Sequence, residues 1–217
     1  MRQAFNFMGC WTLREMLGRR AFDEQELLDA LDEVPTDSIY VHTYGNLLRH
    51  KYIAGPYPND FATWAAIQVR DRVLGEKLAV IDPFEFPDLE AVRAELISLI
   101  DDHLRSMRSV PRVVFGEPFD FLQSRVVEVP TGIRVQTLRE FRDALAETVD
   151  ASVIFYHMIE ARLHKGRKQS HFSVWIEEGL GNRALAESVG RLDPYGLSLE
   201  GIRTRLVALC DSALKQD

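Results

Sequence analysis

The chain has 217 residues, 46% of them hydrophobic, which is sufficient for a buried core. Its net charge is −7, and its basic residues are scattered rather than gathered into a patch, which argues against nucleic acid as a partner. No apolar run approaches the roughly 20 residues that cross a bilayer, and the first residues lack the apolar core of a secretion signal. We therefore expect a cytoplasmic protein with no membrane partner.

The two cysteines, Cys10 and Cys210, lie far apart in the chain among apolar neighbours. They form neither a Cys-x-x-Cys pair nor another spacing typical of metal ligands. Free cysteine usually packs as a small hydrophobic residue, so we expect two buried thiols. The lone glycines make no loop that could cradle a phosphate, and we expect no cofactor.

In chain order, the segments that open each half of the sequence predict a small β component. The segments "FNFM" (5–8), "RVVF" (112–115) and "FDFLQSRVVEVPTG" (119–132) alternate in polarity or are rich in β-branched residues. We expect one or two strands in each half, which could pair with one another. A Pro-Thr-Gly turn is predicted at 130–132.

An amphipathic helix is predicted after the strand segments of each half. Apolar residues recur there at spacings of three and four, which gives an apolar stripe. The stripe residues are Leu27, Leu28, Leu31 and Val34 in the first half, and Leu138, Phe141, Leu145 and Val149 in the second. Asp23 and Thr137 are suitable N-caps.

Histidine-bearing segments follow, "IYVHTYGNLLRH" (39–50) and "IFYHMIEARLH" (154–164), and we expect both to be helical. Next come helices that contain tryptophan, with N-caps at Asn59 or Asp60 in the first half and at Ser170 in the second. The segment 88–107 is the clearest helix of the chain, because its apolar positions recur every three or four residues.

The two halves repeat one pattern. "NDFATW" matches "SHFSVW" at an offset of 111 positions, and the histidines His42 and His157 align at an offset of 115. The sequence thus predicts two tandem homologous helical repeats, residues 5–104 and 113–214, packed as one globular body with approximate twofold symmetry. The expected fold is mainly α with a minor β component, and the alternative is an α+β fold.

The histidine segments are the candidate site. His157, Glu160 and His164 share one helical face, but Gly45 stands where a second carboxylate would be needed, so the match to a di-metal site is poor and we expect no metal. Three interpretations remain open. The histidines could be hydrogen-bonded core residues, they could line a cleft for a small polar ligand, or they could act in acid–base catalysis.

The candidate ligand-binding residues combine side chains of both halves that can donate or accept hydrogen bonds. They are His42, Asn59, Asp60, His157, Glu160 and Arg162. If the two halves pack face to face, tyrosine and tryptophan side chains would form the walls of such a cleft. For Asn59 and Asp60 the competing interpretation is a helix cap.

Several sequence motifs together resemble those of an uncharacterised bacterial and archaeal family, a domain of unknown function. They are "HTYGNLLRH", "PNDFATW", "PTG" followed by "LREFRDAL", "YHMIEARL" and "LDPYGLSLEGIR". The resemblance covers nearly the whole chain and implies a genomic association with glycosyltransferases and enzymes of storage-sugar metabolism. The chain departs from the family pattern at Tyr44, where a second histidine is common, and at "QSHF" (169–172), where Asn-Asp-Phe is common.

These observations lead to two functional hypotheses. The first is a non-enzymatic accessory or small-ligand-binding protein linked to carbohydrate metabolism, with a small polar ligand or a sugar-metabolism enzyme as its partner. The alternative is an enzyme that uses His157 with Glu160, or His42 with Asp60, as an acid–base pair on a small polar substrate. Such a pair would need a water-accessible cleft and a pKa near neutrality.

Overall fold

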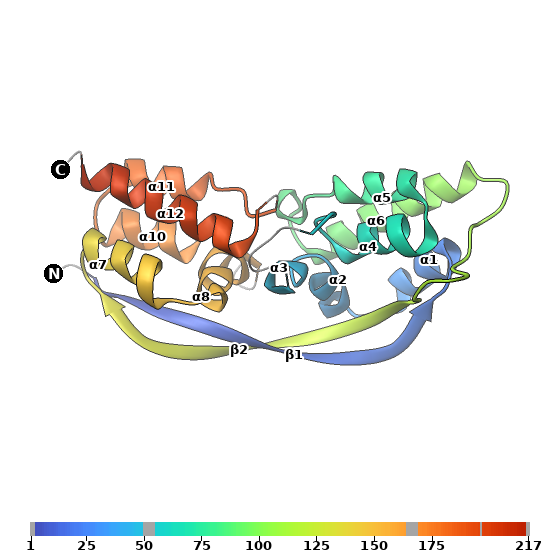
Figure 1. Cartoon of the computed structure of the whole chain (residues 1–217), viewed down its shortest axis with the longest axis horizontal. Helices are drawn as coiled ribbons and strands as arrows, with labels where there is room; N and C mark the ends of the chain where they lie inside the picture. The colour runs from blue at the N-terminus through green and yellow to red at the C-terminus, as the bar shows by residue number, and fades with distance from the viewer. Residues whose placement is uncertain (1–2, 50–54, 164–168, 196, 216–217) are drawn as a thin grey trace. The chain divides into compact units, whose positions relative to one another are not determined.

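The computed structural model of the protein describes residues 3–49, 55–163, 169–195 and 197–215. Within these ranges most residues are helical, and β1 (Phe5–Ala21) and β2 (Phe119–Val135) form a two-stranded antiparallel sheet (Figure 1). The prediction of a mainly helical fold with a minor β component is confirmed. None of the described helices combines the length and the apolar character needed to cross a membrane.

The chain divides into two compact units. Unit 1 contains the described residues of Met1–Trp11 and Val126–Asp217, and unit 2 contains those of Thr12–Arg49 and Ala54–Arg125. Each strand contributes one part to each unit. The bounds of the compact units therefore differ from those of the predicted repeats, 5–104 and 113–214. The internal repeat and its twofold symmetry stay predictions.

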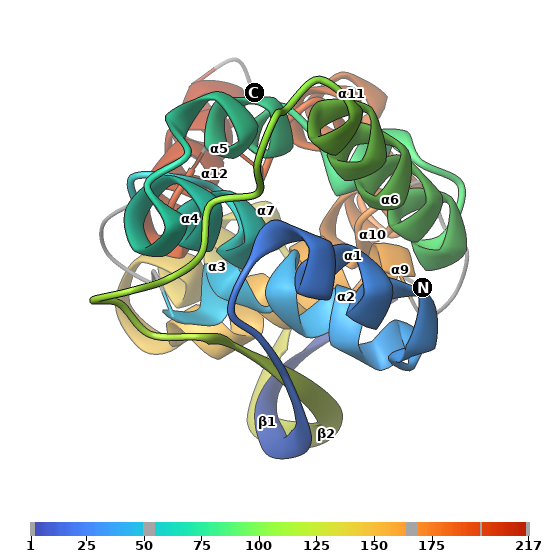
Figure 2. The same cartoon turned by 90° about the vertical axis from the view of Figure 1, so that its right-hand side faces the viewer.

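Unit 2 carries a set of short helices and one long one (Figure 2). They are α1 (Glu24–Glu33), α2 (Thr36–His42), α3 (Asn46–Arg49), α4 (Asp60–Trp64), η1 (Ala65–Val69), α5 (Arg72–Ala79), η2 (Pro83–Glu85) and α6 (Leu89–Arg105). The long helix α6 packs against α1, α2 and α5. Val92, Leu96 and Ile100, which follow the spacing of three and four expected for this helix, are fully buried, together with Leu27 and Leu31 of α1.

Unit 1 carries the remaining helical segments. They are α7 (Leu138–Asp143), η3 (Ala144–Thr148), α8 (Ala151–Phe155), η4 (Tyr156–Glu160), α9 (Ala161–Leu163), α10 (His171–Glu178), α11 (Arg183–Gly190) and α12 (Leu199–Leu214). Aromatic rings from β1 and from these helices form its core. Phe7 stacks on Phe141 with 5.5 Å between ring centroids, and Phe5 lies 5.3 Å from Trp175.

The predicted N-caps are confirmed at the start of the first helix of each half. Asp23 accepts a hydrogen bond from the backbone N–H of Glu26 (2.8 Å). Thr137 forms a capping box with Glu140, in which each side chain accepts a bond from the other residue's backbone N–H. Ser170 caps α10, and of the two candidates for α4 it is Asn59 that caps the helix.

Two predictions about the strands are wrong. No turn ends the strand at Pro130–Gly132, because β2 continues to Val135. Thr131 Oγ1 donates to the carbonyl of Phe7 (2.6 Å), and Gly132 has a φ of 77°, which glycine adopts at little cost. The segment "RVVF" is not a strand either, since Arg112 forms only an isolated bridge with Asp23.

The histidine segment of the first half is a broken helix rather than a continuous one. Helix α2 ends at His42, and α3 begins only at Asn46. Between them the backbone folds back so closely that a Cβ atom on Gly45 would lie 2.6 Å from the carbonyl oxygen of Val41. The equivalent segment of the second half runs without interruption through α8, η4 and α9, with a π-helical turn at Tyr156–Glu160.

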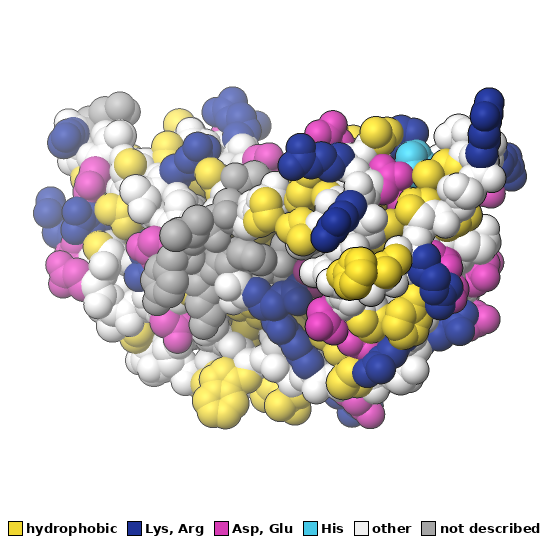
Figure 3. Space-filling model, turned by 45° about the vertical axis from the view of Figure 1, so that its right-hand side comes forward, with side chains coloured by type: hydrophobic (Ala, Val, Ile, Leu, Met, Phe, Trp, Pro, Cys, Tyr) yellow, Lys and Arg dark blue, Asp and Glu magenta, His cyan; other side chains and the backbone are white. Residues whose placement is uncertain are grey.

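The charged surface agrees with the scattered distribution of basic residues in the sequence. On the face drawn in Figure 3, lysine and arginine side chains are dispersed, and acidic side chains lie between them. The described residues on this face form no continuous basic patch of the kind that follows a nucleic-acid backbone.

Candidate functional site

His42 is anchored between a strand and a helix of unit 2. Its side chain is 3% exposed, and its ring centroid lies 4.6 Å from that of Phe119. The backbone N–H of Leu122 in β2 donates to His42 Nε2 (3.0 Å), and His42 Nδ1 lies 2.8 Å from Asp60 Oδ2 at the start of α4. A backbone N–H can only donate, so Nε2 carries no proton and Nδ1–H donates to Asp60.

Asp60 carries the negative charge of this arrangement. Burial by itself would raise the pKa of Asp60, but the hydrogen bond from His42 and the positive charge of Arg49 outweigh burial and lower it. Arg49 also donates to Asp60 Oδ2. Burial lowers the pKa of His42, and Asp60 opposes that shift only in part. The pair is therefore a neutral imidazole that donates to an ionised carboxylate.

His157 occupies a similar position in unit 1. Its ring is buried, 4.8 Å from Phe5 and stacked on Phe172 at 5.0 Å between centroids. The backbone N–H of Met8 in β1 donates to His157 Nε2 (2.8 Å), and His157 Nδ1 lies 3.2 Å from His171 Nδ1. By the argument used for His42, His157 is protonated at Nδ1 and donates to His171. Burial, with a contribution from His171, holds its pKa well below the usual value.

The hydrogen bonds of both rings limit what they can do chemically. A general base or a metal ligand needs a nitrogen with an available lone pair. In His42 and His157 that nitrogen, Nε2, already accepts a backbone N–H, and the other nitrogen donates to a side chain. The geometry therefore favours a structural role, in which each imidazole ties a strand to the start of a tryptophan helix.

The two units differ in the partner of the buried histidine. Asp60 and His171 are each the first residue of a helix, α4 and α10, and each directly follows its N-cap. The departure "QSHF" in the sequence therefore replaces the carboxylate that faces His42 by an imidazole that faces His157. In unit 2 the buried histidine therefore faces a carboxylate at this position, and in unit 1 it faces a second imidazole.

Asn59 is committed to helix capping. Its Oδ1 accepts from the backbone N–H of Ala62 (2.8 Å), and its Nδ2 donates to the carbonyl of Leu78 (3.0 Å). Replacement by alanine should lower the free energy of unfolding by about 1–2 kcal/mol, because both bonds are lost in a buried place. Chemical denaturation would measure this change.

Serine offers a matched control for Asn59, since Ser170 caps α10 with its hydroxyl. Asn59→Ser should recover the cap but not the bond to Leu78, and its stability should lie between those of the wild type and Asn59→Ala. If Asn59→Ala is as stable as the wild type, the amide is not needed as a cap, and its role as a ligand contact regains support.

Glu160 and Arg162 lie in unit 1, as predicted from their place in the second histidine segment. Glu160 is buried in η4. Arg162 Nη2 donates to the carbonyl of Gly190 at the end of α11 (3.5 Å). His50 and His164, and residues 165–168 of the basic segment, lie outside the described residues. The predicted cleft with walls from both halves stays a prediction.

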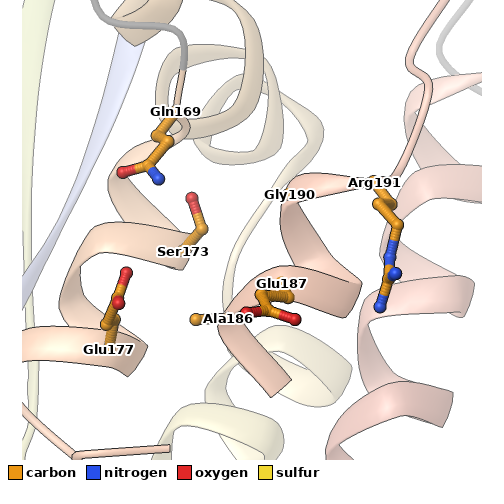
Figure 4. Close-up of a pocket in the computed structure, with 7 residues that line it drawn as sticks. All are labelled: Gln169, Ser173, Glu177, Ala186, Glu187, Gly190 and Arg191. Carbon is orange, nitrogen blue, oxygen red and sulfur yellow. The ribbon is translucent and has the colours of Figure 1, made fainter. Parts of the chain in front are cut away.

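A pocket of about 380 Å³ lies between α10 and α11 in unit 1 (Figure 4). Its lining residues are Gln169, Ser173, Glu177, Ala186, Glu187, Gly190 and Arg191. Ser173 and Glu177 lie four residues apart on one face of α10, opposite Glu187, and Gln169 lies just before the N-cap of that helix. Gly190 leaves room there, because a Cβ atom added to it would meet no atom within 4 Å.

Sequence reasoning missed this pocket, although it identified a residue at its edge. Arg162 contacts Gly190, which lines the pocket, so one of the six predicted site residues touches the pocket wall. The lining side chains read in the sequence as the exposed faces of two amphipathic helices. The signal that could have indicated them is the spacing of four between Ser173 and Glu177 in one helix, combined with the small residues Ala186 and Gly190 in the next.

A second pocket, of about 310 Å³, lies in unit 2. Its lining residues are Leu13, Arg14, Glu15, Asp37, Gln123, Ser124 and Arg125. Two of its polar side chains already bind each other, since Gln123 Nε2 donates to Glu15 Oε2 (2.7 Å). None of the six predicted site residues lines it.

The fold places the chain among mainly helical proteins with a minor β part. The chain belongs to a family described as "Family of unknown function (DUF5752)", whose sequence profile matches residues 2–211. A solved structure with a similar fold is described as "The structure of OrfY from Thermoproteus tenax". The similarity has a TM-score of 0.80 at 25% sequence identity and covers 98% of this chain and 96% of that chain. No curated protein matches the sequence.

Proposed function

We propose that this protein is a non-enzymatic accessory protein that binds a small polar ligand in the pocket between α10 and α11. The observation that carries the proposal is the pocket itself, about 380 Å³ in volume and lined by polar side chains from two facing helices. A hollow with a few convergent polar groups is the usual form of a small-molecule site. Arg162, a residue expected from the sequence to bind ligand, supports its wall at Gly190.

The chemistry of the lining favours a ligand with several hydroxyl groups. Glu177 and Glu187 can accept hydrogen bonds, Arg191 can donate them, and Gln169 can do both. Arg183 pairs with Glu187 (3.0 Å), and the remaining charges of the lining, Glu177 and Arg191, balance each other, which favours an uncharged polar ligand. A sugar or another polyol fits this set, and the resemblance to a family associated with glycosyltransferases supports a place in carbohydrate metabolism.

The alternative, an acid–base enzyme, has less support. Asp60 does orient His42, as the base of a catalytic pair would need, but the Leu122 N–H occupies the nitrogen that would take the proton. The same holds for His157 and the Met8 N–H. Catalysis at either ring would require the strand to leave the histidine first.

We also propose how the two halves of the protein arose, where the protein is located and which kind of partner it has. The matched bonds from Leu122 to His42 and from Met8 to His157 support a duplication that produced two related halves about an approximate twofold axis. We place the protein in the cytoplasm, and the partner that its ligand-bound form would regulate is an enzyme of sugar metabolism.

A thermal-shift screen of sugars, polyols and nucleotide sugars tests the binding proposal. A ligand present at about 100 times its Kd stabilises the folded state by about 2.7 kcal/mol, which raises Tm by roughly 5–10 °C in a chain of this size. We expect at least one sugar or polyol to raise Tm in this way. A screen in which no compound changes Tm would contradict the proposal.

Two pairs of variants locate the binding. Gly190→Leu should fill the pocket and abolish the shift, whereas Ala184→Leu, on an exposed part of α11 outside the pocket, should keep it. Glu177→Gln should weaken binding, whereas Glu178→Gln, its exposed neighbour outside the lining, should not. Equal binding by both members of each pair would place the ligand elsewhere.

A further inference from the structure

Three side chains of unit 2 that can bind a metal converge at one point, and neither His42 nor His157 is among them. They are Glu24 at the start of α1, Asp71 at the N-cap of α5, and His103 near the end of α6. One potential ligand atom from each lies within 4.8 Å of the other two, and His103 Nε2 is 2.8 Å from Asp71 Oδ2. Helices that belong to one core thus position the three groups, since α6 packs against both α1 and α5.

Glu24 is the unusual member of this cluster. Its side chain is 0% exposed, and neither of its carboxylate oxygens has a hydrogen-bond partner among the residues that the structure describes. A buried carboxylate without partners is costly, because it loses its hydration and gains nothing in return. Burial raises the pKa of Glu24 to about 7, and the charges of Asp71 and Asp23 add to that shift. His103 is also buried, and no described residue forms a hydrogen bond with its Nδ1.

We propose that Glu24, Asp71 and His103 form a binding site for one divalent transition-metal ion. One imidazole nitrogen and two carboxylates suit Zn²⁺ or Mn²⁺ better than an alkaline-earth ion, which prefers oxygen ligands alone. The two carboxylates balance the charge of the ion, and the ion gives the Glu24 oxygens the partner that they lack. Asp71 can bind with Oδ2, because its capping bond to the Leu74 N–H uses Oδ1.

The other unit indicates that the cluster is not required for packing. The N-cap of α11 is Asn182, whose side chain accepts the Leu185 N–H just as the N-cap of α5, Asp71, accepts the Leu74 N–H. Helix α7 begins with Leu138 where α1 begins with Glu24. Under the predicted repeat, a neutral amide and an apolar side chain thus serve where unit 2 has two carboxylates. The carboxylates of unit 2 therefore call for an explanation other than the fold.

Calorimetric titration of the full-length, metal-free protein with Zn²⁺ and, separately, Mn²⁺ tests this site. We expect one ion per chain for at least one of the two metals, a higher Tm in its presence, and much weaker binding of Mg²⁺. Glu24→Gln should lower the affinity by more than about 100-fold, since even the loss of an outer contact of a metal ligand costs roughly 10–100-fold. Asp71→Asn should lower it as well, and asparagine can keep the cap, as Asn182 does.

Glu95→Gln is the matched control, because Glu95 lies exposed on α6, the helix that carries His103. It should bind the ion like the wild type. Circular dichroism would verify that each variant folds, and the two ligand variants give independent tests if one of them does not. The proposal is overturned if neither Zn²⁺ nor Mn²⁺ binds at one ion per chain, or if Glu24→Gln and Asp71→Asn bind as tightly as Glu95→Gln.

Discussion

Replacement of His157 by alanine should lower the free energy of unfolding by at least about 3 kcal/mol. The substitution leaves a cavity among Phe5, Phe172 and the other rings around the imidazole, and truncation of a large buried side chain costs roughly 2–5 kcal/mol. It also leaves the Met8 N–H without its acceptor, which adds about 1–3 kcal/mol. Urea denaturation, followed by circular dichroism and by tryptophan fluorescence, measures the change.

Glutamine is the control that separates the hydrogen bond from the ring. Its Oε1 can reach the position of Nε2 and accept the Met8 N–H, so His157→Gln should be more stable than His157→Ala. If His157 has only a structural role, a ligand that binds the α10–α11 pocket should still bind the glutamine variant with unchanged affinity. A variant that is as stable as the wild type but has lost ligand binding would place His157 in the binding site.

Acid should destabilise the protein through both buried histidines. In the folded state the pKa values of His42 and His157 lie below the usual 6.5, so the unfolded chain binds more protons as the pH falls. Their contribution to stability is complete above about pH 6.5 and is lost as the pH falls toward the folded-state pKa values. Protonation of the unfolded chain sets the upper bound of this loss, about 2 kcal/mol for each histidine between pH 7 and pH 5.

Other buried groups contribute to the same pH range with a different sign. The raised pKa of Glu24 means that the folded state takes up a proton first as the pH falls, which stabilises it. Asp60 stays ionised down to pH 5, because its pKa is lowered. The stability of the wild type alone therefore reports a sum, and the histidine contribution must be measured as a difference.

The difference between the wild type and His157→Gln isolates the contribution of His157. The wild type should be the more stable protein at pH 7, and its advantage should shrink by up to about 2 kcal/mol at pH 5, because glutamine does not titrate. Measurements in EDTA exclude any effect of a metal ion. If the difference is the same at pH 5 and pH 7, the pKa of His157 is not lowered on folding, and the ring is not held neutral.

The sequence was sufficient for most of the helices, because their signals are local. The caps Asp23 and Thr137 and the apolar stripe of α6 depend on residues within one helix, and the structure has them as predicted. The extent of the strands depends instead on pairing between distant parts of the chain. β2 passes through Pro130–Gly132 because β1 lies opposite it, where Phe7 accepts a bond from Thr131.

The candidate site was predictable only in part. The sequence suggested His42 with Asp60 as a pair, and the structure places their side chains 2.8 Å apart. The backbone donors that occupy the histidines could not be foreseen, since Leu122 and Met8 are far from His42 and His157 in the chain. Glu24 could not be recognised for a second reason. An acidic residue in the first turn of a helix usually lies in solvent and interacts with the helix dipole.

The central claim is that His42 and His157 are neutral anchors that accept a backbone N–H at Nε2. Long-range ¹H–¹⁵N correlation spectra of the imidazole rings, recorded from pH 8 to pH 5, test it directly. We predict that both rings are in the Nδ1–H tautomer at neutral pH and that the ¹⁵N shifts of His157 show no titration at the usual imidazole pKa of about 6.5. A ring in the Nε2–H tautomer, or a His157 ring that titrates near pH 6.5, would contradict the anchor role and return the histidines to the candidate active site.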